Sequence, residues 1–139
     1  MLNNKQVITL LSPWPNSSSP LTKIRHMYIC KESHDNTCEF FICNHISPDS
    51  LNEIQSGMVD EFPDVTRNPF RRPTRINCRI VHKSTGVDYD ASLLTTIRRD
   101  ICDELYERLL QEYDHSFKLV AVLDTEAILA LNPTTTRRI

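Results

Sequence analysis

A short stretch of the chain concentrates positive charge without any acidic residue. Residues 67–83, RNPFRRPTRINCRIVHK, contain six Lys and Arg side chains and no Asp or Glu, although the 139-residue chain has a formal net charge of -2. Apolar and polar residues alternate over 74–83, which predicts a strand whose successive side chains point to opposite faces. The cationic side chains could bind carboxylates or phosphates. The candidate contact residues are Arg71, Arg72, Arg75, Arg79 and Lys83.

The segments around this strand carry the opposite charge. Residues 47–66 contain five acidic residues and no Lys or Arg. Residues 100–114 contain six acidic residues, with Arg108 as their only Lys or Arg. If both segments are helices that cover one face of a sheet, the cations of 74–83 should occupy the other, open face. The sequence therefore predicts a molecule with charge segregated between two faces.

Three interpretations of the cationic strand compete. It can be a solvated sheet face whose arginine stems cover apolar surface. It can be a docking surface for an acidic protein partner or for a second copy of the chain, because complementary charge steers association. It can bind RNA or DNA through phosphates. We adopt the docking surface as the predicted function and nucleic-acid binding as the alternative, because no aromatic residue for base stacking is interleaved on the strand.

A dense group of cysteine and histidine residues raises the question of a zinc site. Five such residues fall within sixteen positions: Cys30, His34, Cys38, Cys43 and His45. Their spacing matches no common zinc pattern, in which ligands come in close pairs. One hairpin register would place four potential ligands on one face, and a shift of one residue would separate them. These four are His26, Cys30, Cys43 and His45. We predict structural thiols and no metal, with a zinc-stabilised small domain as a further alternative.

The sequence offers little support for catalysis. The only glycines are Gly57 and Gly86, so neither a phosphate-binding loop nor a dinucleotide-binding turn can be formed. No cysteine or histidine sits in a recognisable nucleophile motif. The acidic pairs of 100–107 lie off the apolar stripe of a predicted helix, as solvated carboxylates do. We therefore expect no enzyme and no cofactor.

Cellular context is indicated only by broad features. The cysteine count is odd, no signal peptide is evident, and no apolar run is long enough to span a membrane. We expect a soluble protein of the cytoplasm or nucleus, not secreted, with self-association as one possible mode of binding. Low glycine content and small size would also suit a viral accessory protein.

Hydrophobic patterns predict the elements of secondary structure. Strands are expected at 6–11, 23–30, 38–46, 74–83 and 117–123, and 13–20 is a proline-rich loop. The second and third strands form a hairpin, and the last, almost wholly apolar, is expected to be central in the sheet. Helices are expected at 47–62, at 91–113 with Asp90 as its cap, and at 124–131, where a strand is the alternative.

These elements predict an α+β fold. A single mixed sheet, built from the hairpin plus two further strands, would carry two helices packed on one face. Residues 1–132 would form a single globular domain, and residues 133–139 a flexible C-terminal tail.

Overall fold

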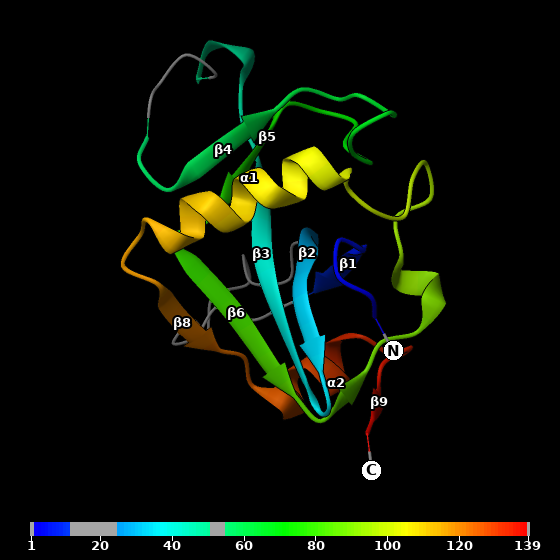
Figure 1. The fold of residues 1–139 in the computed structure, drawn as a ribbon. Helices are drawn as coiled ribbons and strands as arrows, with labels where there is room; N and C mark the ends of the chain where they lie inside the picture. Colours follow the sequence, from blue (N-terminus) through cyan, green and yellow to red (C-terminus); the bar gives the residue numbers. More distant parts are fainter. Residues whose placement is uncertain (1, 12–24, 51–54, 139) are drawn as a thin grey trace.

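A seven-stranded mixed sheet forms the middle of the protein. The computed structural model describes residues 2–11, 25–50 and 55–138, so the predicted loop at 13–20 lies outside the described residues (Figure 1). The strands of the sheet are β1 (Val7–Leu11), β2 (Arg25–His34), β3 (Thr37–His45), β4 (Met58–Glu61), β5 (Thr74–Asn77), β6 (Ile80–Thr85) and β8 (Leu119–Val122). The α+β class holds, but the sheet is larger than the expected hairpin plus two strands.

Strand β3 organises this sheet. The predicted hairpin is present, with β2 antiparallel to β3 along one edge. The other edge of β3 is shared, because its first residues pair with β6 and its last residues pair with β5. One arm of the sheet therefore continues from β5 to β4, and the other continues from β6 to β8, which runs parallel to β6.

Helices cover both faces of the sheet. Helix α1 (Asp103–Asp114) lies over one face, and the short helix α2 (Thr125–Leu131) packs against the other (Figure 1). The α1-side core comprises Val7, Ile29, Phe41, Cys43, Val59, Phe70, Ile76, Cys78, Val81, Ile101, Leu105 and Leu109. The α2-side core comprises Leu2, Ile8, Leu10, Tyr28, Cys30, Cys38, Phe40, Ile42, Val87, Tyr89, Leu123 and Ile128. The sheet therefore has a buried core on each side, and the expected packing of helices on one face only is wrong.

The predicted helix at 47–62 is not formed. Pro48–Ser50 is a single 3-10 turn, residues 51–54 lie outside the described residues, and Met58–Glu61 is strand β4. Gly57 turns the chain into β4 with a φ of 79°, in the left-handed region that favours glycine. In this strand Asp60 forms an ion pair with Arg75, and Glu61 forms one with Arg67. These tertiary contacts outweigh the helical spacing of the apolar residues, which predicted a helix.

The long helix starts later than its apolar stripe suggests. Asp90 caps only a 3-10 turn at Ala91–Leu93, and α1 begins at Asp103. The segment between them runs along the edge of β1 opposite β2, where the Thr95 amide donates to the Val7 carbonyl at 3.0 Å and the Val7 amide donates to the Arg99 carbonyl at 2.8 Å. This pairing protects a sheet edge and removes 94–102 from the helix.

The C-terminal elements differ from the prediction in two respects. The helix at 124–131 is confirmed as α2, with the Asp124 carboxylate capping its first turn. Strand β8 is an edge strand, not a central one, because it pairs only with β6 in the sheet described here. Part of the expected flexible tail forms β9 (Thr136–Arg137), which pairs with β7 (Val87–Asp88).

Asn132 joins the segment after α2 to the end of β1. Its buried side chain accepts from the Leu11 amide at 2.9 Å and donates to the Leu11 carbonyl at 2.7 Å. These bonds satisfy both backbone groups at the end of β1 and hold it beside α2. No helix in the described residues has the length and apolar character needed to cross a membrane.

Candidate functional site

The predicted cationic strand does not present one face. It is broken at Cys78 and Arg79, which separate β5 from β6. Ile76, Cys78 and Val81 all lie in the α1-side core, so the alternation shifts by one residue across the break. Arg75 therefore points to the α2 side and Lys83 to the α1 side, and the prediction of a shared open face is wrong.

Several of the predicted contact residues are already engaged inside the protein. The Arg75 guanidinium donates to both carboxylate oxygens of Asp60, at 2.8 and 2.9 Å, and to the Ser50 carbonyl. Arg79 donates through Nε to the Ser56 carbonyl at 2.6 Å. Lys83 lies across from Glu39 in the register of β6 and β3. Arg71 and Arg72 are exposed on the segment that precedes β5.

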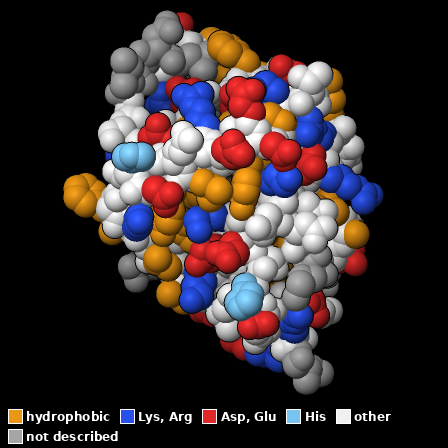
Figure 2. Space-filling view, in the orientation of Figure 1, with side chains coloured by type: hydrophobic (Ala, Val, Ile, Leu, Met, Phe, Trp, Pro, Cys, Tyr) orange, Lys and Arg blue, Asp and Glu red, His pale blue; other side chains and the backbone are white. Residues whose placement is uncertain are grey.

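Charge is not segregated on the face that carries α1. Figure 2 shows acidic and basic side chains interspersed over this face. Many of these charges form ion pairs, such as Arg67 with Glu61 and Glu104, and Arg98 with Asp100. A candidate site for an anionic ligand therefore requires Lys or Arg side chains that form no ion pair within the described residues.

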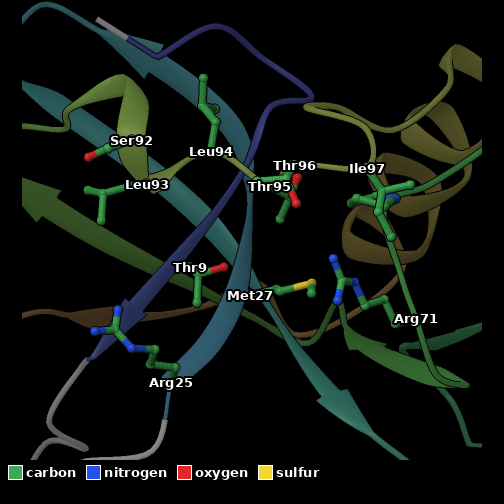
Figure 3. Close-up of a pocket in the computed structure, with 11 residues that line it drawn as sticks. Thr9, Arg25, Met27, Arg71, Ser92, Leu93, Leu94, Thr95, Thr96 and Ile97 are labelled. Atoms are coloured by element: carbon green, nitrogen blue, oxygen red, sulfur yellow. The ribbon is translucent and has the colours of Figure 1, made fainter.

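One cavity meets this requirement. It has a volume of about 310 Å³ and opens beside β1 and β2 (Figure 3). Its lining consists of Thr9, Arg25, Met27, Pro69, Arg71 and the six residues 92–97. A second cavity of about 190 Å³ shares Thr9, Arg25 and Met27 with the first and adds His26, Cys43, His45 and Thr74. We call the two adjoining cavities the groove.

The sheet forms the floor of the groove. Thr9 of β1 and Met27 of β2 are register partners, and they share the α1 side of the sheet with Val7 and Ile29. Figure 3 shows Arg71 extending toward Met27, with Arg25 at the opposite end of the cavity. The floor is thus partly apolar and is flanked by a cation at each end.

Two irregular segments form the walls. One wall, 92–97, is fixed to β1 by the backbone bonds of Thr95 and by a bridge between Leu94 and Ile8. The other wall carries Arg71 and is held by buried Asn68, which accepts from the Phe70 amide at 3.0 Å and donates to the Phe62 carbonyl at 3.0 Å. These bonds preorganise the groove because neither wall depends on a ligand for its position.

The described lining of the groove carries basic side chains and no acidic ones. Its lining, as described, includes Arg25, Arg71, His26 and His45 but no Asp or Glu. Among the residues that the structure describes, no ion pair involves Arg25 or Arg71. Both guanidinium groups are exposed at the mouth of a concave surface, where they can bind anionic groups.

The proposed zinc ligands are separated by the hairpin register. Met27 is opposite Cys43, so partner numbers add to an even sum over this part of the hairpin, and the register shifts only at a bulge between Cys30 and Glu32. Cys30 consequently lies in the α2-side core and Cys43 in the α1-side core. The described residues contain no group of three or more His, Cys, Asp or Glu side chains that could hold a metal ion.

The cysteines of the sheet are buried thiols. Burial raises the pKa of Cys30 and of Cys78 to about 12, and it raises the pKa of Cys43 as well. At neutral pH these groups are protonated and poorly nucleophilic. They contribute apolar packing to the two cores.

Sequence reasoning found only Arg71 among the cations of the groove. Arg25 was missed because it is an isolated cation at the start of β2, and its neighbours in space come from 69–71 and 92–97. The second of these segments was expected to be helical. No local pattern signals the groove, which exists only once β1, β2 and both walls are assembled.

No protein-family model matches the sequence, and no curated protein is significantly similar to it. The groove and the edges of the sheet are therefore the basis for proposing a function.

Proposed function

We propose that this chain is a non-enzymatic interaction protein that binds an acidic, partly apolar segment of a protein partner in the groove. The observation that carries the proposal is the composition of the groove, with Arg25 and Arg71 at its ends and no carboxylate in its described lining. This replaces the open strand face as the docking surface and keeps the expectation of an acidic partner.

The chemistry of the lining favours a peptide segment. Guanidinium groups pair with carboxylates through two parallel hydrogen bonds, which fixes the orientation of the ligand. Met27 and Ile97 offer apolar surface for a neighbouring side chain, and Met adapts to ligands of different shape. The hydroxyl groups of Thr9 and Thr96 can bond the backbone of an extended segment.

Nucleic acid is the alternative ligand for the same cations. Phosphates would also pair with Arg25 and Arg71. Single-stranded nucleic acids are held in addition by base stacking on aromatic rings, and the described lining contains no Phe, Tyr or Trp. The composition of the groove therefore favours a carboxylate-bearing peptide over RNA.

The proposal is tested by the binding of a fluorescein-labelled peptide of alternating Glu and Leu residues, measured by anisotropy at low and moderate salt. The substitution Arg71→Glu places an acid at one end of the groove and should weaken binding at least about tenfold, since it removes a charge-assisted pair and adds repulsion. Arg25→Glu should act in the same direction.

Arg72→Glu is the matched control. It makes the same change of charge at the adjacent exposed residue, which does not line the groove. Equal loss in the Arg71 and Arg72 variants would show that only net charge matters and would contradict a defined site. Tighter binding of a labelled single-stranded RNA than of the peptide, lost in Arg71→Glu, would replace the peptide by nucleic acid as the ligand.

A further inference from the structure

Strand β8 exposes apolar side chains at the end of the sheet arm that continues from β3 through β6. Val122 is 72% exposed, Leu119 and Val120 are each 53% exposed, and Phe117 just before the strand is 91% exposed. Figures 1 and 2 together show apolar atoms projecting at this edge. Exposed apolar edge strands invite pairing with another chain, and proteins usually protect them with charges or prolines. β8 itself contains neither.

The backbone of β8 has a defined set of groups that face outward. The Leu119 amide donates to the Arg79 carbonyl at 3.1 Å, and the Leu123 amide donates to the Lys83 carbonyl at 2.8 Å, so these residues face β6. Successive residues of a strand direct their N–H and C=O groups to opposite edges. Val120 and Val122 therefore direct theirs away from the sheet, toward a prospective partner strand.

We infer that β8 pairs antiparallel with β8 of a second copy of this chain, with Val120 opposite Val122 of the other copy. In this register each Val120 exchanges both of its backbone hydrogen bonds with Val122 across the two-fold axis. Ala121 then faces Ala121 of the other copy on the axis itself. The two sheets become one continuous sheet, and the exposed valines of both copies cover one another.

Charge supports this register. Lys118, with a φ of 53° and its ammonium 4.0 Å from Asp114, precedes the strand, and Asp124 follows it. The antiparallel arrangement places Lys118 of each copy near Asp124 of the other. Two other registers also pair outward-facing residues, Val120 with itself or Val122 with itself. The first puts Lys118 opposite Val122 and the second puts Val120 opposite Asp124, so each sets a charge against an apolar side chain.

A second copy is a better occupant than an unrelated strand because the edge is complementary to itself. Its apolar residues lie in the middle, and a cation and an anion flank them symmetrically, as a two-fold interface requires. The inference does not depend on the proposed function, because the groove lies at β1 and β2, at the other end of the strand path from β8.

The first test is the mass of the protein in solution, measured by light scattering after size exclusion over a range of concentrations. We expect a dimer that dissociates on dilution, because a four-residue strand pair gives a small interface. A monomer at the highest concentration would overturn the inference and would leave a strand of another protein as the occupant of this edge.

Cross-linking tests the register. Residues opposite each other in a non-hydrogen-bonded antiparallel pair have Cα atoms about 4.5 Å apart, which suits a disulfide. The variant Ala121→Cys should therefore form a covalent dimer under mild oxidation. Val122→Cys is the matched control, since Val122 is more exposed but lies diagonally from its counterpart, about 7 to 8 Å away.

The native thiols interfere little with this test, because Cys102 is the only cysteine that is not buried. The unsubstituted protein, oxidised under the same conditions, measures how much covalent dimer forms through Cys102. A dimer in which Val122→Cys or Val120→Cys cross-links faster than Ala121→Cys would contradict the proposed register.

The variant Val122→Pro removes one outward N–H from each copy and should raise the dimer dissociation constant at least about tenfold. It leaves the bonds to β6 intact, because Val122 faces away from β6 and residues such as Leu119 and Leu123 make these bonds. Val122→Thr keeps both the N–H and the branched shape, so it should remain a dimer. Equal dissociation constants for the proline and threonine variants would exclude backbone pairing at this edge.

Discussion

At the scale of single residues, the sheet buries polar groups as well as apolar ones. His82 lies in the α2-side half of the molecule, with its ring edge-to-face with Tyr28 at a centroid distance of 5.9 Å. Burial, with a smaller contribution from His26, lowers the pKa of His82 from 6.5 to about 4. The imidazole is consequently neutral in the folded protein at any pH near neutrality.

This pKa predicts how stability depends on pH. Between pH 6.5 and pH 4 the unfolded chain binds a proton at His82 that the folded protein does not, so stability falls as the pH is lowered. The loss attributable to His82 should approach about 3 kcal/mol near pH 4. Denaturant unfolding of the wild-type and His82→Gln proteins at a series of pH values measures this loss of stability. Parallel curves for the two proteins would show that other groups cause the acid sensitivity.

Residue types could be predicted better than their partners. The alternation at 74–83 correctly marks Ile76 and Cys78 as core residues, but it assumes an unbroken strand. The break at Cys78 and Arg79 separates Arg75 from Lys83, and Asp60 neutralises Arg75 from a segment that the apolar spacing assigns to a helix. A charge pattern therefore gives no reliable surface until the register of every neighbouring strand is known.

At the scale of elements, local signals succeed where neighbours in sequence are neighbours in space. The hairpin of β2 and β3 and the short helix α2 are predicted from their own residues, through a polar turn and the Asp124 cap. The segments 58–61 and 94–102 are mispredicted as helix because each is fixed by distant backbone, β5 in one case and β1 in the other. Helical spacing cannot reveal such pairing, since tertiary contacts decide it.

The turn before β4 gives a prediction about glycine. Gly57 and Gly86 both have positive φ, 79° and 75°, but a Cβ at Gly57 would also lie 2.5 Å from Cγ of Arg79, whereas one at Gly86 meets only Asn36 at 3.9 Å. Gly57→Ala should therefore destabilise the fold by about 2 kcal/mol and Gly86→Ala by about 1 kcal/mol. Urea unfolding of the two variants compares them. A larger loss of unfolding free energy in Gly86→Ala than in Gly57→Ala would indicate that the Arg79 side chain moves aside freely from a Cβ at position 57.

At the scale of the whole molecule, the strand path places the two proposed surfaces apart. The order β1, β2, β3, β6, β8 puts the groove at one end of the sheet and the apolar edge at the other. A dimer through β8 would leave a groove open at each far end. Binding of a partner and self-association can therefore occur together.

Independence of the two surfaces is itself testable. Val122→Pro should change the affinity for the Glu-Leu peptide by less than about twofold, and Arg71→Glu should leave the dimer dissociation constant unchanged, because distant sites without shared partners act additively. Titrations of each variant by both assays measure this. A dimer constant that shifts on peptide binding would instead reveal coupling through β3.

Asn132 has a consequence for how the chain reaches its fold during synthesis. It binds the end of β1, a separation of 121 residues, and Ile128 of α2 is fully buried on the same side of the sheet. A ribosome must therefore release the chain as far as Asn132 before the α2-side core can close. Until then Ile8, Leu10 and Phe40 face water, so the nascent chain carries an apolar surface of the kind that chaperones bind.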